Sequence, residues 1–500
     1  MEKPFHISKF KTRPYAHQLD CLNRFGRREY FALLAEMGTG KSWIVINNMA
    51  DLWASADCFG ALVLAPNGVH TNWIVNEIPA HMPDWVKYRA VAWNSSARKS
   101  ERLELEKLLE PTDDLHVLTM NHEALQTRKG FEFAQRFLHA HAWPMIAVDE
   151  SDAYKTPSAV RTKNLLRLKP LAKWRRILSG TPVNNSPFDL FTQFAFLDEH
   201  ILQTSSFFAF KAEYADMIDE NSSLGFAIRN RAGARRMPQV VAKDAYGRPR
   251  YKNLDKLNAL IAPYSYRVLK ADCLDLPEKI YKTLYFDLTP EQRAVYEKAA
   301  EDCMLVVDGE ETPFNKLVAV QKLAQITSGY FLHPNADEPV RIAGANPKLD
   351  LLTERLQALN GAQCVVWARY RAEISDICGR LRERGLSFVE YHGGVARDDR
   401  TAAIAAFERG DVQIFVGNQQ AGGTGITLNA AAFVIYFSNS FSLHDRLQSE
   451  DRAHRIGQKK NVTYINLAAR HTIDEVVVRA LLSKKNVAEV VLSTQNWRYL

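Results

Sequence analysis

Residues 31–42 read FALLAEMGTGKS, a short apolar run followed at once by a glycine-rich turn. The apolar run, Phe31 to Ala35, predicts a buried β-strand, and residues Trp43 to Met49 predict a helix after the turn. The turn follows the phosphate-loop pattern G-x-x-x-x-G-K-[ST], except that Ala35 stands in the place of the first glycine. A strand, a phosphate loop and a helix in this order predict an α/β domain that binds a nucleotide at the start of the helix.

The residue types in this turn suit the binding of ATP and Mg²⁺. Gly38 and Gly40, with Thr39 between them, let backbone amides face the phosphates. Lys41 can reach the outer phosphates, and Ser42 offers its hydroxyl to the metal ion. The alternative is a Gly-Lys-Ser turn that arises by chance, so the rest of the chain must decide between the two.

Apolar, β-branched runs recur in two separate stretches of the chain. Continuous rather than alternating hydrophobicity is typical of strands buried on both faces, as in a parallel sheet covered by helices. Helical patterns such as 372–384 and 398–409 lie between the runs of the second stretch. We therefore expect an α/β protein with two parallel-sheet lobes in tandem. The runs are 61–65, 116–119, 145–149 and 176–179 in the first stretch, and 364–367, 387–391, 413–416, 433–437 and 462–467 in the second.

The chain between the two stretches lacks this alternation of strand and helix. Residues 207–217 and 291–302 predict helices, and residues 335–347 (NADEPVRIAGANP) predict a hinge or linker. We therefore expect a mainly helical and basic insertion between the two lobes. The expected domains are a first lobe over 1–200, the insertion and linker over 201–345, and a second lobe over 346–500.

The composition excludes several classes of protein. Of the 500 residues, 46% are hydrophobic and 24% are charged, which is typical of a globular protein rather than a disordered or fibrous chain. We find no stretch of the ~18 to 20 apolar residues that a membrane helix needs, and no signal peptide at the N-terminus. The six cysteines form no C-x-x-C pair, so we expect neither a zinc site nor disulfides, and a reducing cytoplasm.

Positive charge is concentrated between Gly225 and Lys252. The whole chain has a net charge of +7, from 64 basic and 57 acidic residues. This segment has eight basic residues and one acid, Asp244, so its net charge of +7 equals that of the whole chain. Clustered positive charge suits a polyanion, because each phosphate contact releases condensed counterions, although a solvated basic loop is the alternative. The arginines that we expect to bind nucleic acid are Arg235, Arg236, Arg248 and Arg250.

Acidic residues follow the buried run at 145–148. Asp149 and Glu150 stand at the carboxyl end of this predicted strand, where α/β sheets bind ligands. Asp149 would hold Mg²⁺, and Glu150 would polarise the attacking water. The alternative is a helix cap, but the position of the pair after a phosphate loop favours catalysis. A second loop, Ser-Gly-Thr-Pro at 179–182, follows another predicted strand.

The segment 448–458 reads QSEDRAHRIGQ and contains Arg452 and Arg455. The two arginines are three residues apart on a predicted helix and therefore near one face of it. Guanidinium groups directed at a γ-phosphate act as arginine fingers, which stabilise the charge that grows in the transition state. The alternative is a solvated, arginine-rich helix face.

Taken together and in this order, the motifs resemble those of superfamily-two helicases, and specifically the Swi/Snf-type translocases on double-stranded DNA. The resemblance extends from about residue 10 to 485. The segments at 448–458 and 264–279 (YSYRVLKADCLDLPEK) are the most specific to this family. The other matching segments are RPYAHQLDCL (13–22), AEMGTGKS (35–42), LVLAPNGVHTNWIVNEI (62–78), VLTMNHEAL (117–125), DESD (149–152), LSGTPVNN (178–185), VVWARY (365–370) and GNQQAGGTGITLNAA (417–431).

The resemblance implies two RecA-like lobes, an ATP-binding first lobe and a helicase C-terminal second lobe, with ATP in the cleft between them. Gln18 matches the family's adenine-reading glutamine, and Thr181 matches the residue that couples hydrolysis to lobe movement. The family's carboxylate box usually ends in Ala-His, whereas this chain has Ser151 and Asp152 there. The coupling function of position 152 is therefore open.

The resemblance also implies contacts with DNA. Asn72 and Trp73 fall in the block that packs near the tracked strand. Gly423, Thr424 and Gly425 match the second-lobe block that contacts the DNA backbone and senses the nucleotide. Small residues suit this task, because backbone amides can then approach phosphate closely.

The function that the resemblance implies is a DNA-stimulated ATPase that translocates on duplex DNA, and remodels the DNA or displaces bound protein. Hydrolysis would require closure of the lobes, because Arg452 and Arg455 belong to the second lobe. The alternatives are a strand-separating DNA or RNA helicase, a non-hydrolysing nucleic-acid scaffold, and a small-molecule phosphotransferase. We expect a monomeric, cytoplasmic motor of the compact form found in phages or prokaryotes, because no accessory domain flanks the motifs.

Overall fold

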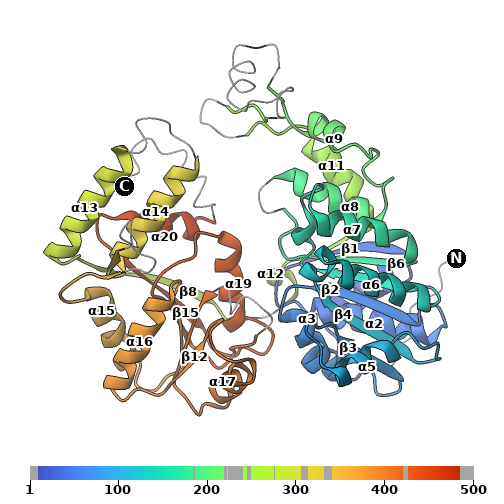
Figure 1. The fold of residues 1–500 in the computed structure, drawn as a ribbon, viewed down its shortest axis with the longest axis horizontal. Helices are drawn as coiled ribbons and strands as arrows, with labels where there is room; N and C mark the ends of the chain where they lie inside the picture. The colour runs from blue at the N-terminus through green and yellow to red at the C-terminus, as the bar shows by residue number, and fades with distance from the viewer. Residues whose placement is uncertain are drawn as a thin grey trace. The chain divides into compact units, whose positions relative to one another are not determined.

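The computed structural model describes residues 9–183, 186–218, 222, 240–244, 249–274, 276–305, 313–331, 340–419 and 426–484. The chain divides into two compact units, Met1–Leu274 and Asp275–Leu500. Each unit contains a parallel β-sheet with helices packed on it, and in Figure 1 the first unit runs from blue to green and the second from yellow to red. The expected α/β class with two parallel-sheet lobes is therefore confirmed.

The sheet of the first unit has seven parallel strands in the order β3-β4-β2-β5-β6-β1-β7. The five inner strands coincide with predicted runs. The edge strands β3 and β7 lie outside them, because each contains a solvent-exposed arginine, Arg89 or Arg267, that interrupts the apolar pattern. The strands are β1 (Tyr30–Ala35), β2 (Gly60–Ala65), β3 (Tyr88–Ala92), β4 (Leu115–Asn121), β5 (Met145–Asp149), β6 (Trp174–Leu178) and β7 (Ser265–Val268).

Helices cover both faces of this sheet. In β2, Leu62 and Leu64 point into one hydrophobic core, whereas Ala61, Val63 and Ala65 point into the other. Both faces of the strand are fully buried, which explains why its sequence is apolar throughout. The helices of this unit are α1 (Ala16–Phe25), α2 (Lys41–Ala54), α3 (Val69–Asn72), α4 (Ile78–His81), α5 (Lys99–Lys107), α6 (Arg128–Ala140), α7 (Val160–Leu168), α8 (Leu190–Leu197), α9 (Phe207–Tyr214), α11 (Leu254–Ile261) and α12 (Lys270–Cys273).

The sheet of the second unit has six parallel strands in the order β12-β13-β11-β14-β15-β8. The five predicted runs of the second stretch form β11 to β15, and the sheet adds β8 at its edge. In β8 the pattern is again interrupted, because Tyr281, Lys282 and Tyr285 are exposed. The strands are β8 (Lys279–Phe286), β11 (Cys364–Trp367), β12 (Phe388–Tyr391), β13 (Ile414–Gly417), β14 (Phe433–Tyr436) and β15 (Val462–Ala469), with an antiparallel pair β9 (Tyr330–Phe331) and β10 (Val340–Arg341).

The helices of the second unit confirm the two helical patterns predicted there. The predicted segments 372–384 and 398–409 form α16 and α17, and α17 is followed by Gly410 at a φ of 83°. The helices of this unit are α13 (Pro290–Leu305), α14 (Pro313–Thr327), α15 (Pro347–Ala358), α16 (Arg371–Glu383), α17 (Arg397–Arg409), α19 (Leu443–Ala453) and α20 (Ile473–Leu482).

Residues 201–345, expected as an insertion and linker, contribute to both units. Helices α9 and α11 pack on the core of the first unit, through Phe210 and Leu257 among others. Helix α14 packs against α20 of the second unit, where Leu323 and Val476 share a core. Within the expected linker, 335–339 lie outside the described residues, while the following chain forms β10 and the start of α15.

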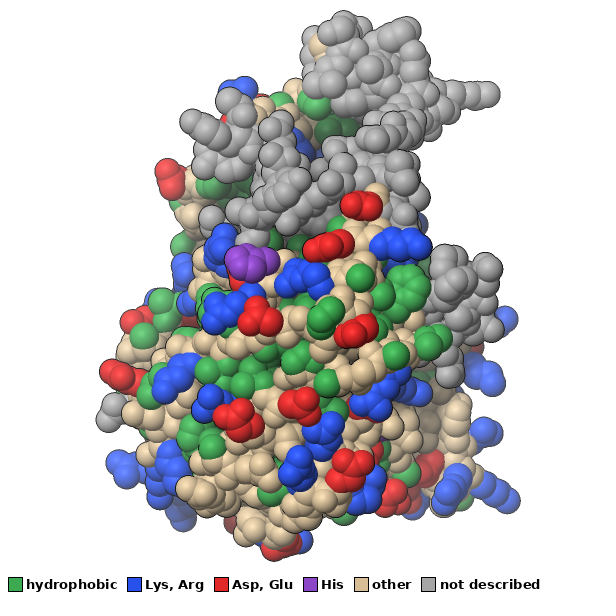
Figure 2. Space-filling model, turned by 90° about the vertical axis from the view of Figure 1, so that its left-hand side faces the viewer, with side chains coloured by type: hydrophobic (Ala, Val, Ile, Leu, Met, Phe, Trp, Pro, Cys, Tyr) green, Lys and Arg blue, Asp and Glu red, His purple; other side chains and the backbone are tan. Residues whose placement is uncertain are grey.

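Two further features concern membrane insertion and surface charge. Within the described ranges, every helix is too short or too polar to cross a lipid bilayer. On the face seen in Figure 2, lysine and arginine side chains alternate with aspartate and glutamate around scattered hydrophobic groups. Mixed charge of this kind gives little long-range electrostatic field.

Candidate active site

Three loops of the first unit meet at one edge of its sheet. The phosphate loop (36–40) follows β1, the carboxylate box (149–152) begins at the last residue of β5, and the Ser-Gly-Thr-Pro loop (179–182) follows β6. In the sheet these strands are neighbours in the order β5-β6-β1, and parallel strands end at the same edge. A Cβ at Gly180 would lie 3.1 Å from Cγ of Met37, so the glycine permits close contact between two of these loops.

The phosphate loop has the backbone that its sequence predicts. Gly38 and Gly40 have φ angles of 78° and 86°, a region that favours glycine, and Gly40 directly precedes α2. Lys41 is the first residue of α2, and its Nζ donates a hydrogen bond of 3.1 Å to the carbonyl oxygen of Ala35. Ser42 follows as the second residue of the helix. The loop therefore presents a helix N-terminus, an ammonium group and a hydroxyl to one region.

Helix α1 holds this loop from one side. His17 Nε2 lies 2.8 Å from the carbonyl oxygen of Thr39, and Gln18 Nε2 donates to the carbonyl oxygen of Gly40 over 3.4 Å. The Oε1 of Gln18 accepts from the backbone N–H of Tyr15 at 2.9 Å. Gln18 is thus next to the phosphate loop, and its buried amide also caps α1. The adenine-reading role of Gln18 stays a prediction.

The carboxylate box is buried and strained. Trp73 Nε1 donates to Oδ2 of Asp149 at 3.2 Å, and the backbone N–H of Glu150 donates to Oδ1 at 3.1 Å. Burial, and then the like charge of Glu150, raise the pKa of Asp149 to about 7, while Lys41 opposes this shift. Glu150 has a left-handed backbone (φ 49°, ψ 59°), which costs a non-glycine residue about 1 to 3 kcal/mol.

The residues of this edge fit ATP with Mg²⁺. The Oε2 of Glu150 is buried without a hydrogen-bond partner among the described residues, as expected for a group that faces a ligand or water. Serine hydroxyls and carboxylates are the oxygen ligands that Mg²⁺ prefers, and Ser42 and Asp149 supply them. A bound Mg²⁺ ion would also offset the mutual repulsion of Asp149 and Glu150.

In the second unit, Arg452 and Arg455 lie at the end of α19. Arg452 Nη1 contacts the carbonyl oxygen of Ile426 at 3.5 Å, and Arg455 Nη1 donates to Oγ1 of Thr427 at 2.9 Å. The expectation that both arginines share one helix face is wrong, because α19 ends at Ala453. His454 leaves the helical conformation, and its Nε2 lies 2.6 Å from the carbonyl oxygen of Pro277.

A buried ionic network supports α19. Arg446 Nε donates to Oε1 of Glu450 at 2.9 Å, and Lys279 Nζ of β8 donates to Oε2 at 3.1 Å. Burial opposes ionisation of Glu450, but Arg446, Lys279 and a hydrogen bond from Tyr281 outweigh it and lower its pKa. Gln458, which follows the helix, donates hydrogen bonds to the backbone carbonyl oxygens of Asn429, Ala431 and Ala453. Side chains on several elements therefore hold the segment 448–458, which we call the arginine block.

The residues predicted to contact nucleic acid are only partly described. Trp73 is 0% exposed and hydrogen-bonded to Asp149, and Asn72 is half-buried and donates to Oε1 of Glu77 at 3.3 Å. Arg250 is exposed and pairs with Asp216 at 2.9 Å. Their nucleic-acid roles stay predictions. The predicted residues outside the described part of the chain are Arg235, Arg236, Arg248, Gly423, Thr424 and Gly425.

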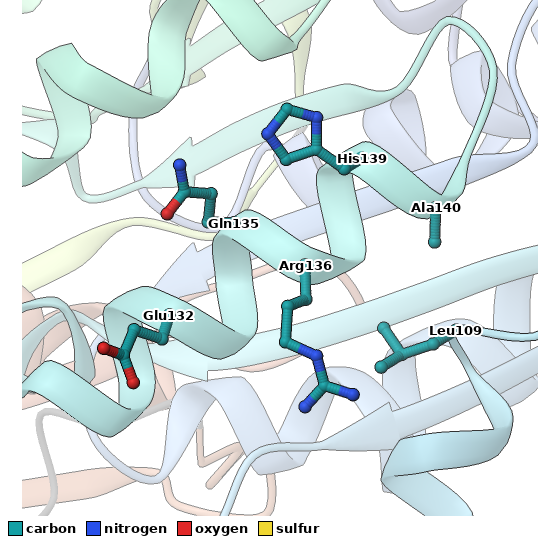
Figure 3. Close-up of a pocket in the computed structure, with 6 residues that line it drawn as sticks. All are labelled: Leu109, Glu132, Gln135, Arg136, His139 and Ala140. Atoms are coloured by element: carbon teal, nitrogen blue, oxygen red, sulfur yellow. The ribbon is translucent and has the colours of Figure 1, made fainter.

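A separate surface pocket lies beside α6 (Figure 3). Glu132, Gln135, Arg136 and His139 extend from α6. Leu109, from the chain before β4, lies on the side of Arg136, whereas Gln135 and His139 point to the other side of the helix. Arg136 uses its guanidinium to bind Glu106 at 2.7 Å, and both side chains are half-exposed. The pocket adjoins the chain that leads into β4 and β5, at the amino ends of these strands. It is therefore not part of the three-loop edge.

The comparison with family models agrees with this geometry. The model for the SNF2-related domain matches residues 17–330, and the model for the helicase conserved C-terminal domain matches residues 347–457. The chain belongs to the SNF2-related family. It thus has the pair of domains that characterises helicase-like ATPases, and the resemblance stated from the motifs is confirmed.

Relatives of this SNF2-related chain occur in animals, plants and bacteria. It is 26% identical to the chromodomain-helicase-DNA-binding protein 1-like of Mus musculus, over 91% of this chain and 47% of that protein. Identity is 25% to the ATP-dependent DNA helicase DDM1 of Arabidopsis thaliana (92% and 59% covered). It is 24% to an uncharacterized ATP-dependent helicase of Mycoplasma pneumoniae (94% and 40% covered). The chain spans about half the length of the curated relatives that it matches.

Among solved structures, the Sulfolobus solfataricus SWI2/SNF2 ATPase core in complex with dsDNA is similar to this chain. The match covers 99% of this chain and 95% of that one, at 22% identity and a TM-score of 0.41.

The SNF2-related fold also creates contacts that the motifs do not reveal. His122 lies 3.1 Å from the hydroxyl of Tyr154 behind the carboxylate box, and Gln193 of α8 joins this box to the Ser-Gly-Thr-Pro loop. In the sequence, Gln193 could be noticed because it is a polar residue within the apolar segment LFTQFAFL, which predicts that its side chain is buried. Such a residue needs a partner, but the sequence does not say which one.

Proposed function

We propose that this chain is a DNA-stimulated ATPase that translocates on duplex DNA, and remodels the DNA or displaces bound protein. The observation that supports this most directly is the meeting of a phosphate loop, a carboxylate pair and a Ser-Gly-Thr-Pro loop at one sheet edge of an SNF2-related chain. We propose a monomer in the reducing cytoplasm, where the thiols of Cys21, Cys58, Cys364 and Cys378, all buried, would persist.

In this proposal each residue of the first unit has one task. The N–H groups at the start of α2, with Lys41, bind the outer phosphates of ATP, and Gln18 reads the adenine. Ser42 and Asp149 hold the Mg²⁺ ion, which when bound would offset the charge of the phosphates. Glu150 orients the attacking water and accepts its proton. Burial raises the pKa of Asp149 and so disfavours its ionised form, whereas the positive charge of Lys41 favours that form.

We further propose that both units take part in hydrolysis. Arg452 and Arg455 would stabilise the charge on the γ-phosphate, as arginine fingers do, and duplex DNA would favour the arrangement in which they act. Thr181 would couple the nucleotide state to movement. DNA would be contacted by the segment of Asn72 and Trp73, by Gly423 and Thr424, and by the basic arginines.

The test is hydrolysis of ATP in the presence of different nucleic acids. We expect duplex DNA to stimulate turnover more than single-stranded DNA or RNA. A triplex-displacement assay beside a strand-displacement assay separates a translocase from a helicase, because a translocase removes the third strand and leaves the duplex paired. Stimulation by RNA alone, or separation of duplex strands, would favour the helicase alternative. Absence of hydrolysis with every nucleic acid would favour the scaffold.

The basic arginines allow a separate test of the DNA contact. Neutralising Arg235, Arg236, Arg248 and Arg250 to Gln should weaken duplex binding about equally for all sequences, because phosphate contacts position rather than specify. The slope of log affinity against log salt should flatten by up to ~3 to 4, at ~0.9 for each phosphate lost. Fluorescence anisotropy over a salt series measures this. Superimposable curves for variant and wild type would favour the alternative interpretation, in which the basic segment is a solvated loop.

A further inference from the structure

A buried glutamine joins two of the three loops at the sheet edge. Gln193 is 1% exposed, and its Nε2 donates to the backbone carbonyl oxygens of Pro182 at 2.8 Å and of Asp189 at 2.7 Å. Its Oε1 accepts a hydrogen bond of 2.6 Å from Oγ of Ser151. The two carbonyl groups can only accept, so the amide nitrogen must face them and the amide oxygen must face Ser151. The orientation of this side chain is thus fixed by chemistry.

Each end of Gln193 contacts a residue next to one with a proposed catalytic role. Ser151 directly follows Glu150, whose left-handed backbone aims its carboxylate. Pro182 directly follows Thr181. A strained residue such as Glu150 keeps its conformation only when its surroundings determine it. The hydrogen bond from Ser151, itself 1% exposed, is one of the contacts that do so.

Ser151 stands where the family's carboxylate box usually has alanine. A buried hydroxyl without a partner would destabilise the fold, and Gln193 is the partner that this chain provides. The two side chains therefore form a link that an alanine at position 151 could not make. We propose that Gln193 is a positioning residue, which through Ser151 and Pro182 makes the carboxylate box and the Ser-Gly-Thr-Pro loop move together during the proposed ATPase cycle, on which this inference rests.

The variants Gln193→Met and Ser151→Ala test the link. Met is close to Gln in size but bonds neither loop, and Ser151→Ala removes only one hydroxyl. We expect either change to lower kcat of DNA-stimulated hydrolysis by about tenfold to a hundredfold, with KM for ATP nearly unchanged, because misplacement of a catalytic group costs that much. The double variant should be no worse than the single ones, since both remove the same interaction.

The matched control is Thr192→Val on the same helix. Thr192 is equally buried, and its Oγ1 donates to the carbonyl oxygen of Tyr154 at 2.6 Å, without bonding the Ser-Gly-Thr-Pro loop. We expect it to lower the melting temperature as much as Gln193→Met but to leave kcat near the wild-type value. An equal loss of kcat in this control would mean that general loosening of α8, and not the link, is responsible.

Hydrogen exchange measures the coupling without turnover. In Ser151→Ala, we expect faster amide exchange in the peptide at 179–183, although Ser151 does not bond that loop directly. Exchange confined to 149–154, or wild-type kcat in a folded Gln193→Met variant, would overturn the inference and leave the proposed function intact. A wild-type protein without DNA-stimulated hydrolysis would instead overturn the proposed function, and this inference with it.

Discussion

The sheet edge of the first unit and the arginine block of the second are built in different ways. The first is a set of loops held by hydrogen bonds among backbone and neutral side chains, such as those of Gln18, Thr39 and Gln193. The second depends on buried charges, with Arg446 and Glu450 of α19 in contact with each other and Glu450 in contact with Lys279 of β8. In the first unit, Glu150 still has a buried Oε2 without a hydrogen-bond partner among the described residues, which leaves it available for a ligand. Ionic contacts fix the helix that contains Arg452 and leads to Arg455.

The largest effect should come from the charged groups of the first unit. Lys41→Ala removes the ammonium group proposed to bind the phosphates, and Glu150→Gln removes the proposed base but keeps its shape. Each should lower turnover by about 10³-fold or more, because both groups act directly on the reacting atoms in the proposed mechanism. Steady-state hydrolysis with saturating duplex DNA measures this, and Glu150→Gln should retain bound ATP. Lys107→Ala, a surface change in the same unit, is the control, and normal turnover by Lys41→Ala would contradict the ATPase assignment.

The second effect tests whether the second unit contributes to hydrolysis. Arg455→Ala should lower DNA-stimulated kcat by about 10³-fold, the lower range for an arginine finger, with little change in nucleotide affinity. Arg455→Lys should not restore the rate, because an ammonium lacks the planar fork of a guanidinium. Titration with a fluorescent ATP analogue measures affinity beside the kinetics. Arg409→Ala, on the surface of the same unit, should behave as wild type. If Arg455→Ala hydrolyses ATP normally, the first unit is sufficient alone.

The fold could be predicted from the sequence where a strand is buried on both sides. The inner strands of both sheets, such as β2, are apolar throughout because helices cover both faces. The edge strands β3, β7 and β8 contain exposed arginine, lysine or tyrosine residues and do not give this pattern. Burial explains the difference, because a side chain at the rim of a sheet need not be apolar.

The candidate site could be predicted where neighbouring residues share one task, as in the phosphate loop. The site could not be predicted where a contact between two residues depends on the order of the strands in the sheet. Gln193 meets Ser151 only because β5 and β6 are adjacent, and Trp73 reaches Asp149 from the segment after β2, its other neighbour. The end of α19 at Ala453 was also not predicted, and there His454 leaves the helical conformation and contacts Pro277, on a distant part of the chain.

A third prediction concerns the ionic network. Arg446 is 2% exposed, and its guanidinium also lies 3.4 Å from the centre of the Tyr436 ring. Arg446→Met should lower the free energy of unfolding of the second unit by about 3 kcal/mol, because it leaves buried Glu450 without its main partner. Denaturant unfolding measures this. Arg380→Met, which breaks a more exposed pair with Asp350, should cost about 1 kcal/mol or less. Equal effects would show that the network adds no special stability.

The smallest effect is a pH dependence in the first unit. Burial lowers the pKa of His122 to about 3, with a smaller effect of Arg161, and burial lowers that of His141 to about 4. Both are neutral in the folded state, whereas in the unfolded chain they bind protons below their ordinary value of 6.5. The stability that these two histidines contribute is therefore fully present above pH 6.5, and it is lost as the pH falls toward about 4 for His141 and about 3 for His122. Each histidine should contribute a loss of about 1 kcal/mol between pH 7 and 5.5.

The variant that isolates this effect is His141→Gln. The Nε2 of His141 donates to the carbonyl oxygen of Leu108 at 2.8 Å, and a glutamine amide can donate there without titrating. Between pH 7.0 and 5.5, the change in the free energy of unfolding of the first unit should then differ from the wild-type change by about 1 kcal/mol. The contribution of Asp149, whose raised pKa acts in the opposite direction, cancels in this difference. His200→Gln, which changes an exposed histidine of the same unit, is the matched control. If His141→Gln loses as much stability as wild type over this interval, other groups must take up the protons, and the buried histidines are not the cause.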